Sequence, residues 1–192
     1  MRQNLLFNAF LILSILFVAC EKDDPQPAPK PNPEPAVVDS YDFDAVIAAD
    51  YHRIESSYDD FMFFESHALF ADSINTLTRP IIISMNTIFQ IADTVITIEH
   101  LENQFDAEPV VTKVTTGVIG DIIIDINNIP ISFAQAWELL RQSEIGMPTG
   151  NVMTFRNPLT PPFDDYPSYI FATDNGQHIR VYSGDGTVEY YD

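Results

Sequence analysis

The sequence predicts an α+β domain over residues 37–192, in which an antiparallel sheet packs against two helices. Three observations lead to this prediction. The chain is 46% hydrophobic and 12% aromatic, which is more than a disordered chain carries. Residues 42–57 and 132–145 have the apolar spacing of amphipathic helices, and several β-branched segments are bounded by turn-forming residues. A domain of this length can bury a sizeable core without disulfides.

The first half of the domain begins with the helix at 42–57. Apolar side chains recur there at steps of three and four residues, at Phe43, Ile47, Tyr51, Ile54 and Tyr58. Aromatic residues favour a strand at 61–70, and β-branched residues favour strands at 81–91 and 94–100. This order of a helix and then strands suggests that residues 42–100 are a degenerate first copy of the helix-and-strand unit predicted for residues 130–192.

Residues 110–129 are predicted to form one or two further strands, with Gly117 and Gly120 at a bend or bulge. Side chains alternate between the two faces of a strand. One face would then carry Asp121, Ile123 and Asp125, and the other Ile122, Ile124 and Ile126.

The second helix has clear boundary signals. Ser132 is a good N-cap, and Gln135 three residues later completes a capping box. Gly146 and Pro148 end the helix. One stripe carries Phe133, Ala136, Trp137 and Leu140, which places the single tryptophan in the core.

Three strands are predicted to finish the chain, at 168–173, 178–182 and 187–191, joined by turns rich in Asp, Asn and Gly. Alternation gives two sets of side chains. The set assigned to a helix-covered core is Ile170, Ala172, Ile179, Val181, Val188 and Tyr190. The other set is Tyr169, Phe171, His178, Arg180, Tyr182, Glu189 and Tyr191, and it is either exposed or covered by a second layer from residues 61–126.

The N-terminus predicts export. Arg2 precedes an apolar run at 5–19, which is short for a membrane-spanning helix and suits a signal peptide at residues 1–19. The run ends directly before Cys20, the only cysteine of the chain. Ala19 before Cys20 resembles a bacterial lipobox, although Phe17 stands where Leu is usual. The resemblance implies lipidation of Cys20; the alternative is an ordinary signal peptide with an incidental cysteine.

Residues 20–36 are predicted to be a linker between a lipid and the domain. An acidic cluster follows Cys20 and is similar to the export signal of Bacteroidota lipoproteins that reach the outer face of the outer membrane. Proline then occupies every second position from Pro25 to Pro35, which favours an extended spacer. We therefore expect an outer-membrane, lipid-anchored protein exposed at the cell surface, with a periplasm-facing protein as the alternative.

The charge of the chain excludes two classes of partner. Nine basic and 28 acidic residues give a formal net charge of −19. Nucleic acids and anionic lipid headgroups both require clustered Lys and Arg, so neither is expected as a ligand of the domain.

Residues 130–192 resemble the PepSY-like domains of secreted bacterial proteins, in which a helix packs on a small antiparallel sheet. The resemblance is carried by the helix, a strand followed by the Pro-rich connection at 157–162, the strand around Tyr169–Phe171 and two tight turns. The usual hairpin is replaced here by residues 181–188. This similarity implies a non-catalytic module that inhibits a protease or binds a protein.

Motifs for catalysis are weak. Glu65 with His67, and His100 with Glu102, have the spacing that points two ligands to one face of a strand, so a metal site is a weak alternative to no metal. Serine-hydrolase elbows, phosphate-binding loops and EF-hand spacings are absent from the sequence. We expect no cofactor and no enzymatic activity.

The sequence thus predicts a non-catalytic, lipid-anchored cell-envelope protein that binds a protein or peptide. The binding residues proposed from the C-terminal strands are Tyr169, Phe171, Arg180, Tyr182 and Tyr191, because aromatic residues and arginine are enriched in interface hot spots. A secreted hydrolase and a carbohydrate-binding surface lipoprotein remain the alternatives.

Overall fold

A computed structural model of the chain describes residues 39–115, 122–158 and 165–191, all within one compact unit, Val37–Asp192. The predicted signal peptide, Cys20 and the linker lie outside the described residues. The first half of the unit contains α2 (Phe43–Glu55), β1 (Met62–Phe70), a short 3₁₀ helix η1 (Ile74–Thr76), β2 (Ile82–Ile91), β3 (Thr94–His100) and β4 (Val110–Thr115). The second half contains η2 (Ile126–Asn128), α3 (Phe133–Gln142), β5 (Val152–Arg156), β6 (Ser168–Ala172), β7 (His178–Tyr182) and β8 (Val188–Tyr191).

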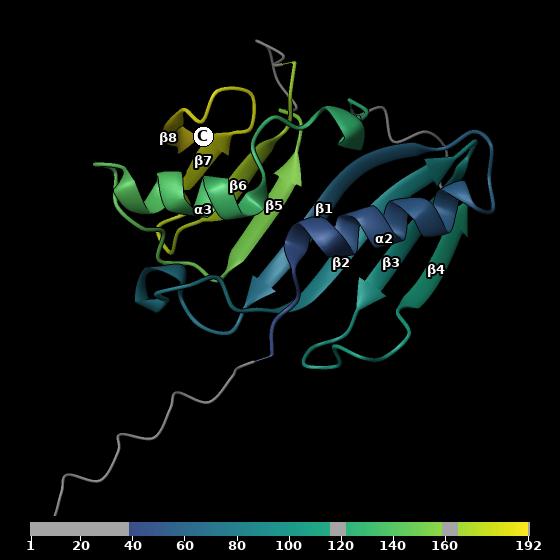
Figure 1. Ribbon diagram of the computed structural model, residues 1–192, viewed down its shortest axis with the longest axis horizontal. Helices are drawn as coiled ribbons and strands as arrows, with labels where there is room; N and C mark the ends of the chain where they lie inside the picture. Colours follow the sequence, from purple (N-terminus) through teal and green to yellow (C-terminus); the bar gives the residue numbers. More distant parts are fainter. Residues whose placement is uncertain (1–38, 116–121, 159–164, 192) are drawn as a thin grey trace, which may run out of the picture. The chain divides into compact units, whose positions relative to one another are not determined.

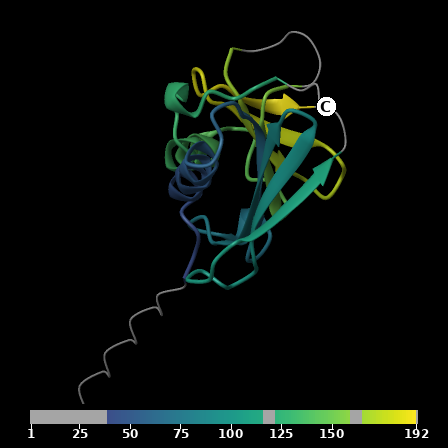
Figure 2. The ribbon, with the colours of Figure 1, turned by 90° about the vertical axis from the view of Figure 1, so that its right-hand side faces the viewer.

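The eight strands form one antiparallel sheet in the order β4-β3-β2-β1-β5-β6-β7-β8. Both helices lie on the same side of this sheet (Figures 1 and 2), so the predicted α+β architecture with two packing helices is confirmed. Each half consists of a helix followed by four strands in sequential order, and the halves meet where β1 pairs with β5. The second half therefore repeats the topology of the first.

The helix boundaries follow local capping chemistry. Asp42 caps α2 by accepting a hydrogen bond from the backbone N–H of Ala45. The predicted capping box between Ser132 and Gln135 is present at α3. Helix α3 ends three residues earlier than predicted, because Ser143 takes an extended backbone and its hydroxyl donates to the carbonyl of Leu140. Neither helix is long and apolar enough to cross a membrane.

The prediction for residues 110–129 is only partly correct. Strand β4 covers Val110–Thr115, whereas 116–121, with Gly117, Gly120 and Asp121, lies outside the described residues. The segment 122–125 is not a strand. A single backbone hydrogen bond joins Ile124 to Phe63 at 2.8 Å, and the Asp125 side chain caps η2 and so starts a 3₁₀ turn. Ile124 is nonetheless buried and Ile123 is 52% exposed.

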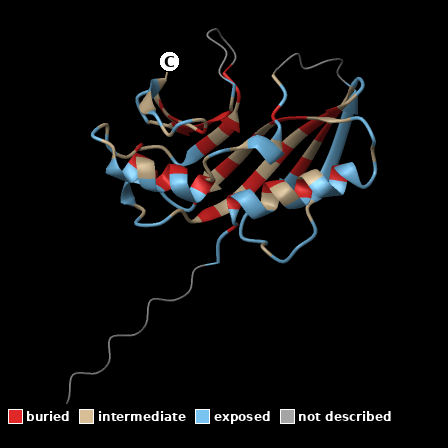
Figure 3. Ribbon diagram, turned by 45° about the horizontal axis from the view of Figure 1, so that its top comes forward, coloured by how far each residue is buried: buried red, intermediate tan, exposed pale blue. Residues whose placement is uncertain are grey.

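Aromatic side chains from both halves form the core between the helices and the sheet. Phe43 of α2 lies 5.1 Å from Phe133 of α3, 5.8 Å from Phe155 of β5 and 6.0 Å from Tyr169 of β6, measured between ring centroids. Trp137 is buried in the same core, as predicted. Buried and less buried residues alternate along several strands, such as β3 and β7 (Figure 3).

The predicted faces of β6 are wrong. Tyr169 and Phe171 are buried beneath the helices at 1% and 0% exposure, and Ile170 lies on the opposite face. The reason is the register of the β6–β7 hairpin, in which Tyr169 pairs with Val181 and Phe171 with Ile179. Directly paired residues share a face, so the aromatic residues of β6 join the aliphatic residues of β7. Both faces of β6 are apolar, and alternation alone could not choose between them.

The corrected faces give a stability prediction. Tyr169→Ala should lower the free energy of unfolding by about 3–5 kcal/mol, because it truncates a buried ring and deletes the hydroxyl that donates to the Ile131 carbonyl at 2.9 Å. Tyr182→Ala, on the other face, should cost clearly less. Urea denaturation of both variants measures the difference. Equal losses would contradict the face assignment.

Candidate functional site

The sheet surface opposite the helices, here termed the helix-free face, carries two continuous rows of paired residues. Strand pairing defines the first row, from β4 to β8, as Val110, Glu99, Asn86, His67, Thr154, Ile170, Arg180 and Glu189. The second row runs from β4 to β7 as Thr112, Thr97, Ile88, Glu65, Arg156, Ser168 and Tyr182. Each row crosses the junction between the two halves.

Four polar side chains at this junction form a connected cluster. The two ring nitrogens of His67 contact different partners: Nδ1 lies 3.0 Å from Thr154 Oγ1, and Nε2 lies 3.2 Å from Glu65 Oε1. The Arg156 guanidinium lies 3.6 Å from the other oxygen of Glu65. Because β1 supplies Glu65 and His67 and β5 supplies Thr154 and Arg156, the cluster depends on the pairing of the two halves.

The electrostatics of the cluster favour the ionised form of Glu65. The hydrogen bond with His67 lowers the pKa of Glu65 most, and the charges of His67 and Arg156 add to the effect against the opposing effect of burial. Thr154, His67 and Glu65 stand in the order hydroxyl, imidazole and carboxylate that many hydrolases use. On this open sheet, however, the same contacts hold three side chains in fixed positions on a surface.

A second group lies on β7 and β8. The Arg180 guanidinium pairs with Glu189 at 2.5 Å and lies over the ring of Tyr191 at 5.3 Å. The ring of Tyr182 lies 6.3 Å from that of Tyr166. Of the five binding residues predicted from sequence, Arg180, Tyr182 and Tyr191 thus share the helix-free face, and Tyr169 and Phe171 do not.

Charge is distributed unevenly over the domain. Four of the 28 acidic residues precede residue 37, which leaves 24 in the domain. The described strands contain three of these, Glu65, Glu99 and Glu189, all on the helix-free face. Arg156 and Arg180 neutralise two of the three. The described strands therefore carry little net charge on the helix-free face, although the protein is strongly acidic.

The four residues of the alternative metal site are not brought together. Glu65 and His67 lie on the helix-free face, whereas His100 pairs with the buried Met85 and faces α2. Glu102 follows β3 in a turn, where its carboxylate accepts from Asn103. The i, i+2 spacing was compatible with a shared site only if both strands pointed these residues to the same face. Within residues 39–115, 122–158 and 165–191, no group of three or more His, Cys, Asp or Glu side chains is placed to hold a metal ion.

His100 instead belongs to a buried polar group under α2. Its Nε2 lies 3.0 Å from Asp50 Oδ1, and the Thr87 hydroxyl donates to Asp50 Oδ2 at 2.7 Å. Asp50 is 1% exposed. The sequence offered one signal for this group, an acidic residue on the apolar stripe of the first helix. The contacts of Asp50 with Thr87 and His100 connect α2 to β2 and β3.

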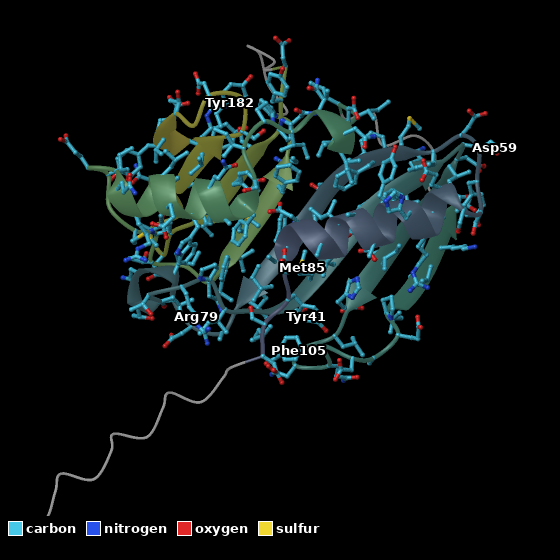
Figure 4. The ribbon with its side chains drawn as sticks, in the orientation of Figure 1. Tyr41, Asp59, Arg79, Met85, Phe105 and Tyr182 are labelled. Atoms are coloured by element: carbon cyan, nitrogen blue, oxygen red, sulfur yellow. The ribbon has the colours of Figure 1, made fainter. Side chains whose placement is uncertain are left out.

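Two of the cavities that border α2 lie near its ends. One, of about 420 Å³, lies beside His100, Tyr41 and Phe105 near the start of the helix. The other, of about 550 Å³, lies beyond its end and is lined by carboxylates, including Asp59, and by aromatic rings. Figure 4 shows Tyr41 and Phe105 near one end of α2 and Asp59 near the other. Neither cavity is lined by the cluster on the helix-free face.

Thr154 and Arg156 were not singled out by sequence reasoning. Their signal is the alternation of β5, where buried Met153 and Phe155 are interleaved with polar residues. Only the pairing with β1 places them beside Glu65 and His67.

Comparison with known proteins finds no match to this chain among protein families, curated proteins or solved structures.

The Glu65 contacts predict a pH dependence. A carboxyl group whose pKa is lowered in the folded state stabilises the protein above its ordinary pKa of 4.5, and loses this contribution as the pH falls through the folded-state value. Glu65→Gln should therefore be less stable than the wild type above about pH 4.5. The difference should shrink at lower pH. Urea unfolding from pH 3 to pH 7 measures it, and a difference that does not change with pH would contradict the prediction.

Proposed function

We propose that the protein is a non-catalytic binding module of the cell envelope, anchored by lipid on Cys20, whose helix-free face contacts a protein or peptide partner. One observation carries the proposal: the described strands carry little net charge on the side opposite the helices, whereas the domain holds 24 acidic residues. Cores of protein interfaces are depleted of charge and enriched in aromatic residues and arginine.

The side chains of this face are held before any partner binds. Hydrogen bonds connect Glu65, His67 and Thr154, and Arg180 is fixed between Glu189 and Tyr191. A partner therefore loses little affinity to the ordering of these side chains. Such a surface suits recognition more than catalysis, which needs water to be excluded from the reacting atoms.

The repeated topology supports a PepSY-like assignment for both halves. The resemblance noted for residues 130–192 involves a helix on an antiparallel sheet, and residues 43–115 follow the same order of elements. We infer two PepSY-like units, the first degenerate in sequence, in one continuous sheet. Protein binding and protease inhibition are the activities that the resemblance implies.

The alternative of carbohydrate binding required a flat exposed patch of aromatic rings. Two members of that patch, Tyr169 and Phe171, are buried in the core. The alternative of a secreted hydrolase is represented by the cluster around His67, and activity abolished by Thr154→Val would favour it.

A matched pair of double variants tests the binding face. Arg180→Ala with Tyr182→Ala changes the helix-free face, and Arg141→Ala with Tyr190→Ala changes an arginine and a tyrosine of the helix side. A partner is first captured from the native envelope with the wild-type protein, and its affinity for each variant is then measured with purified components. The first variant should lose about tenfold or more in affinity. The second should keep it, and equal losses would contradict the proposal.

The anchor is tested by Cys20→Ser. We propose that the wild-type protein sediments with outer membranes and is digested by protease added to intact cells. Each buried CH₂ of an acyl chain contributes about 0.8 kcal/mol, so two or more chains hold a protein firmly. Cys20→Ser should move the protein to the soluble fraction. Retention of that variant in the membrane contradicts lipidation, and protection of the wild-type protein in intact cells places it on the periplasmic side.

A further inference from the structure

Strand β4 has no role in the core. All six of its residues are exposed, as Figure 3 shows along the strand. Val110, Val111 and Val114 are 44%, 43% and 49% exposed, and they are half of the six large exposed hydrophobic residues among those described. None of its side chains packs against the core, whereas Val188 of the opposite edge strand does.

In the part of the chain that the structure describes, no strand pairs with the outer edge of β4, and this edge lacks the usual protection. Natural sheets guard edge strands with charge, proline or short length. The single charged residue of β4 is Lys113. Its amine donates a hydrogen bond to the Tyr58 hydroxyl at 2.8 Å and lies over the Tyr58 ring, so it is turned toward its own chain. At the other edge, β8 has four residues and a paired Glu189. An exposed strand of valine and threonine with an open edge is suited to pair with another strand.

We propose that β4 pairs antiparallel with β4 of a second copy of this chain. The argument is self-complementarity, which an interface with two-fold symmetry requires. A two-fold axis perpendicular to the sheet at Thr112 places Thr112 opposite Thr112 of the partner and Val110 opposite Val114 of the partner. The face that carries these residues is the helix-free face, since Thr112 pairs with Thr97 and Val110 with Glu99.

The helix side of the same register is compatible with pairing. Val111 lies opposite Lys113 of the partner, where it meets the apolar stem of the lysine while the amine stays at Tyr58. The two Glu99 side chains lie in the next strands and about four residues apart along the sheet, beyond the screening length of about 8 Å at physiological salt. The helices of both copies then lie on one side, and the two helix-free faces become continuous.

The inferred dimer has two predictable physical properties. A pair of six-residue strands buries less than the roughly 1,200 Å² of a stable interface, so association is weak and depends on concentration. Each copy carries a formal charge of −19, so the copies repel. Raising the ionic strength from about 0.01 M to about 0.15 M shortens the screening length and should strengthen the dimer. A basic partner strand would show the opposite dependence on salt.

Engineered cysteines test the register in the full chain, in a Cys20→Ser background that has no other thiol. Directly paired residues have Cβ atoms about 4.5–5.5 Å apart, close enough for a disulfide after a small adjustment. Thr112→Cys should therefore form a dimer of the 21.7 kDa chain under mild oxidation. Val110→Cys alone and Val114→Cys alone should not form this dimer, because each residue lies about 13 Å from the same residue of the second chain. An equimolar mixture of the two should cross-link.

A charge variant supplies the second measurement. Thr112→Lys places two ammonium groups opposite each other and should abolish the self-association that sedimentation detects for the parent chain. Because Thr112 is exposed, unfolding by urea should be nearly unchanged. Absence of the Thr112→Cys dimer, a Val110→Cys dimer as strong as that of the mixture, or a parent chain that remains monomeric at high concentration and salt would overturn the proposal.

Discussion

The antiparallel pairing of β1 with β5 joins two helix-and-four-strand halves, and most other features of the domain depend on it. The two halves share one hydrophobic core: the ring of Phe43 from the first half packs among Phe133, Phe155 and Tyr169 of the second. The same pairing places Glu65 opposite Arg156 and His67 opposite Thr154 on the other side of the sheet. One ladder thus sets both the hydrophobic core and the polar cluster.

Polar contacts on the helix side also connect the two halves. The carboxylate of Asp44 in α2 accepts the backbone N–H of Phe133, the first residue of α3, at 3.0 and 3.2 Å. Burial raises the pKa of Asp44, and the hydrogen bond from Phe133 partly opposes that increase. The nearby Tyr169 hydroxyl donates to the carbonyl of Ile131, and burial raises its pKa as well. The two helices are therefore held in register with each other as well as with the sheet.

The division of the sheet into two chemically different sides accounts for the proposed activity. The helices cover one side completely enough that Val181 and Phe171 are 0% exposed. The opposite side has arginine–carboxylate pairs and aromatic rings on a sheet that continues to an open edge at β4. A partner at β7 and β8 and a second copy at the edge of β4 would lie at opposite ends of the sheet, so the two interactions are compatible.

Local sequence signals predicted most of the helices and strands, but they did not decide which face of each strand is buried. The capping box at Ser132, the apolar stripes of both helices and the β-branched strands each act within a few residues, so the sequence alone predicted both helices, the strands at 61–70, 81–91 and 94–100, and the C-terminal hairpins. Residues 122–125 were predicted as strand and are not, because Asp125 caps a 3₁₀ turn.

The candidate site was predicted in part: Arg180, Tyr182 and Tyr191 share the helix-free face, whereas Tyr169 and Phe171 lie in the core. Strand β6 is apolar on both sides, so only its register with β7 decided which side faces the helices. The separation of His67 from His100 follows from the registers of the β1–β2 and β2–β3 pairs. The contact of Glu65 with Arg156 follows from the pairing of β1 with β5, which are distant in sequence. For such strands the cost of closing long loops and the packing of a shared core select one register.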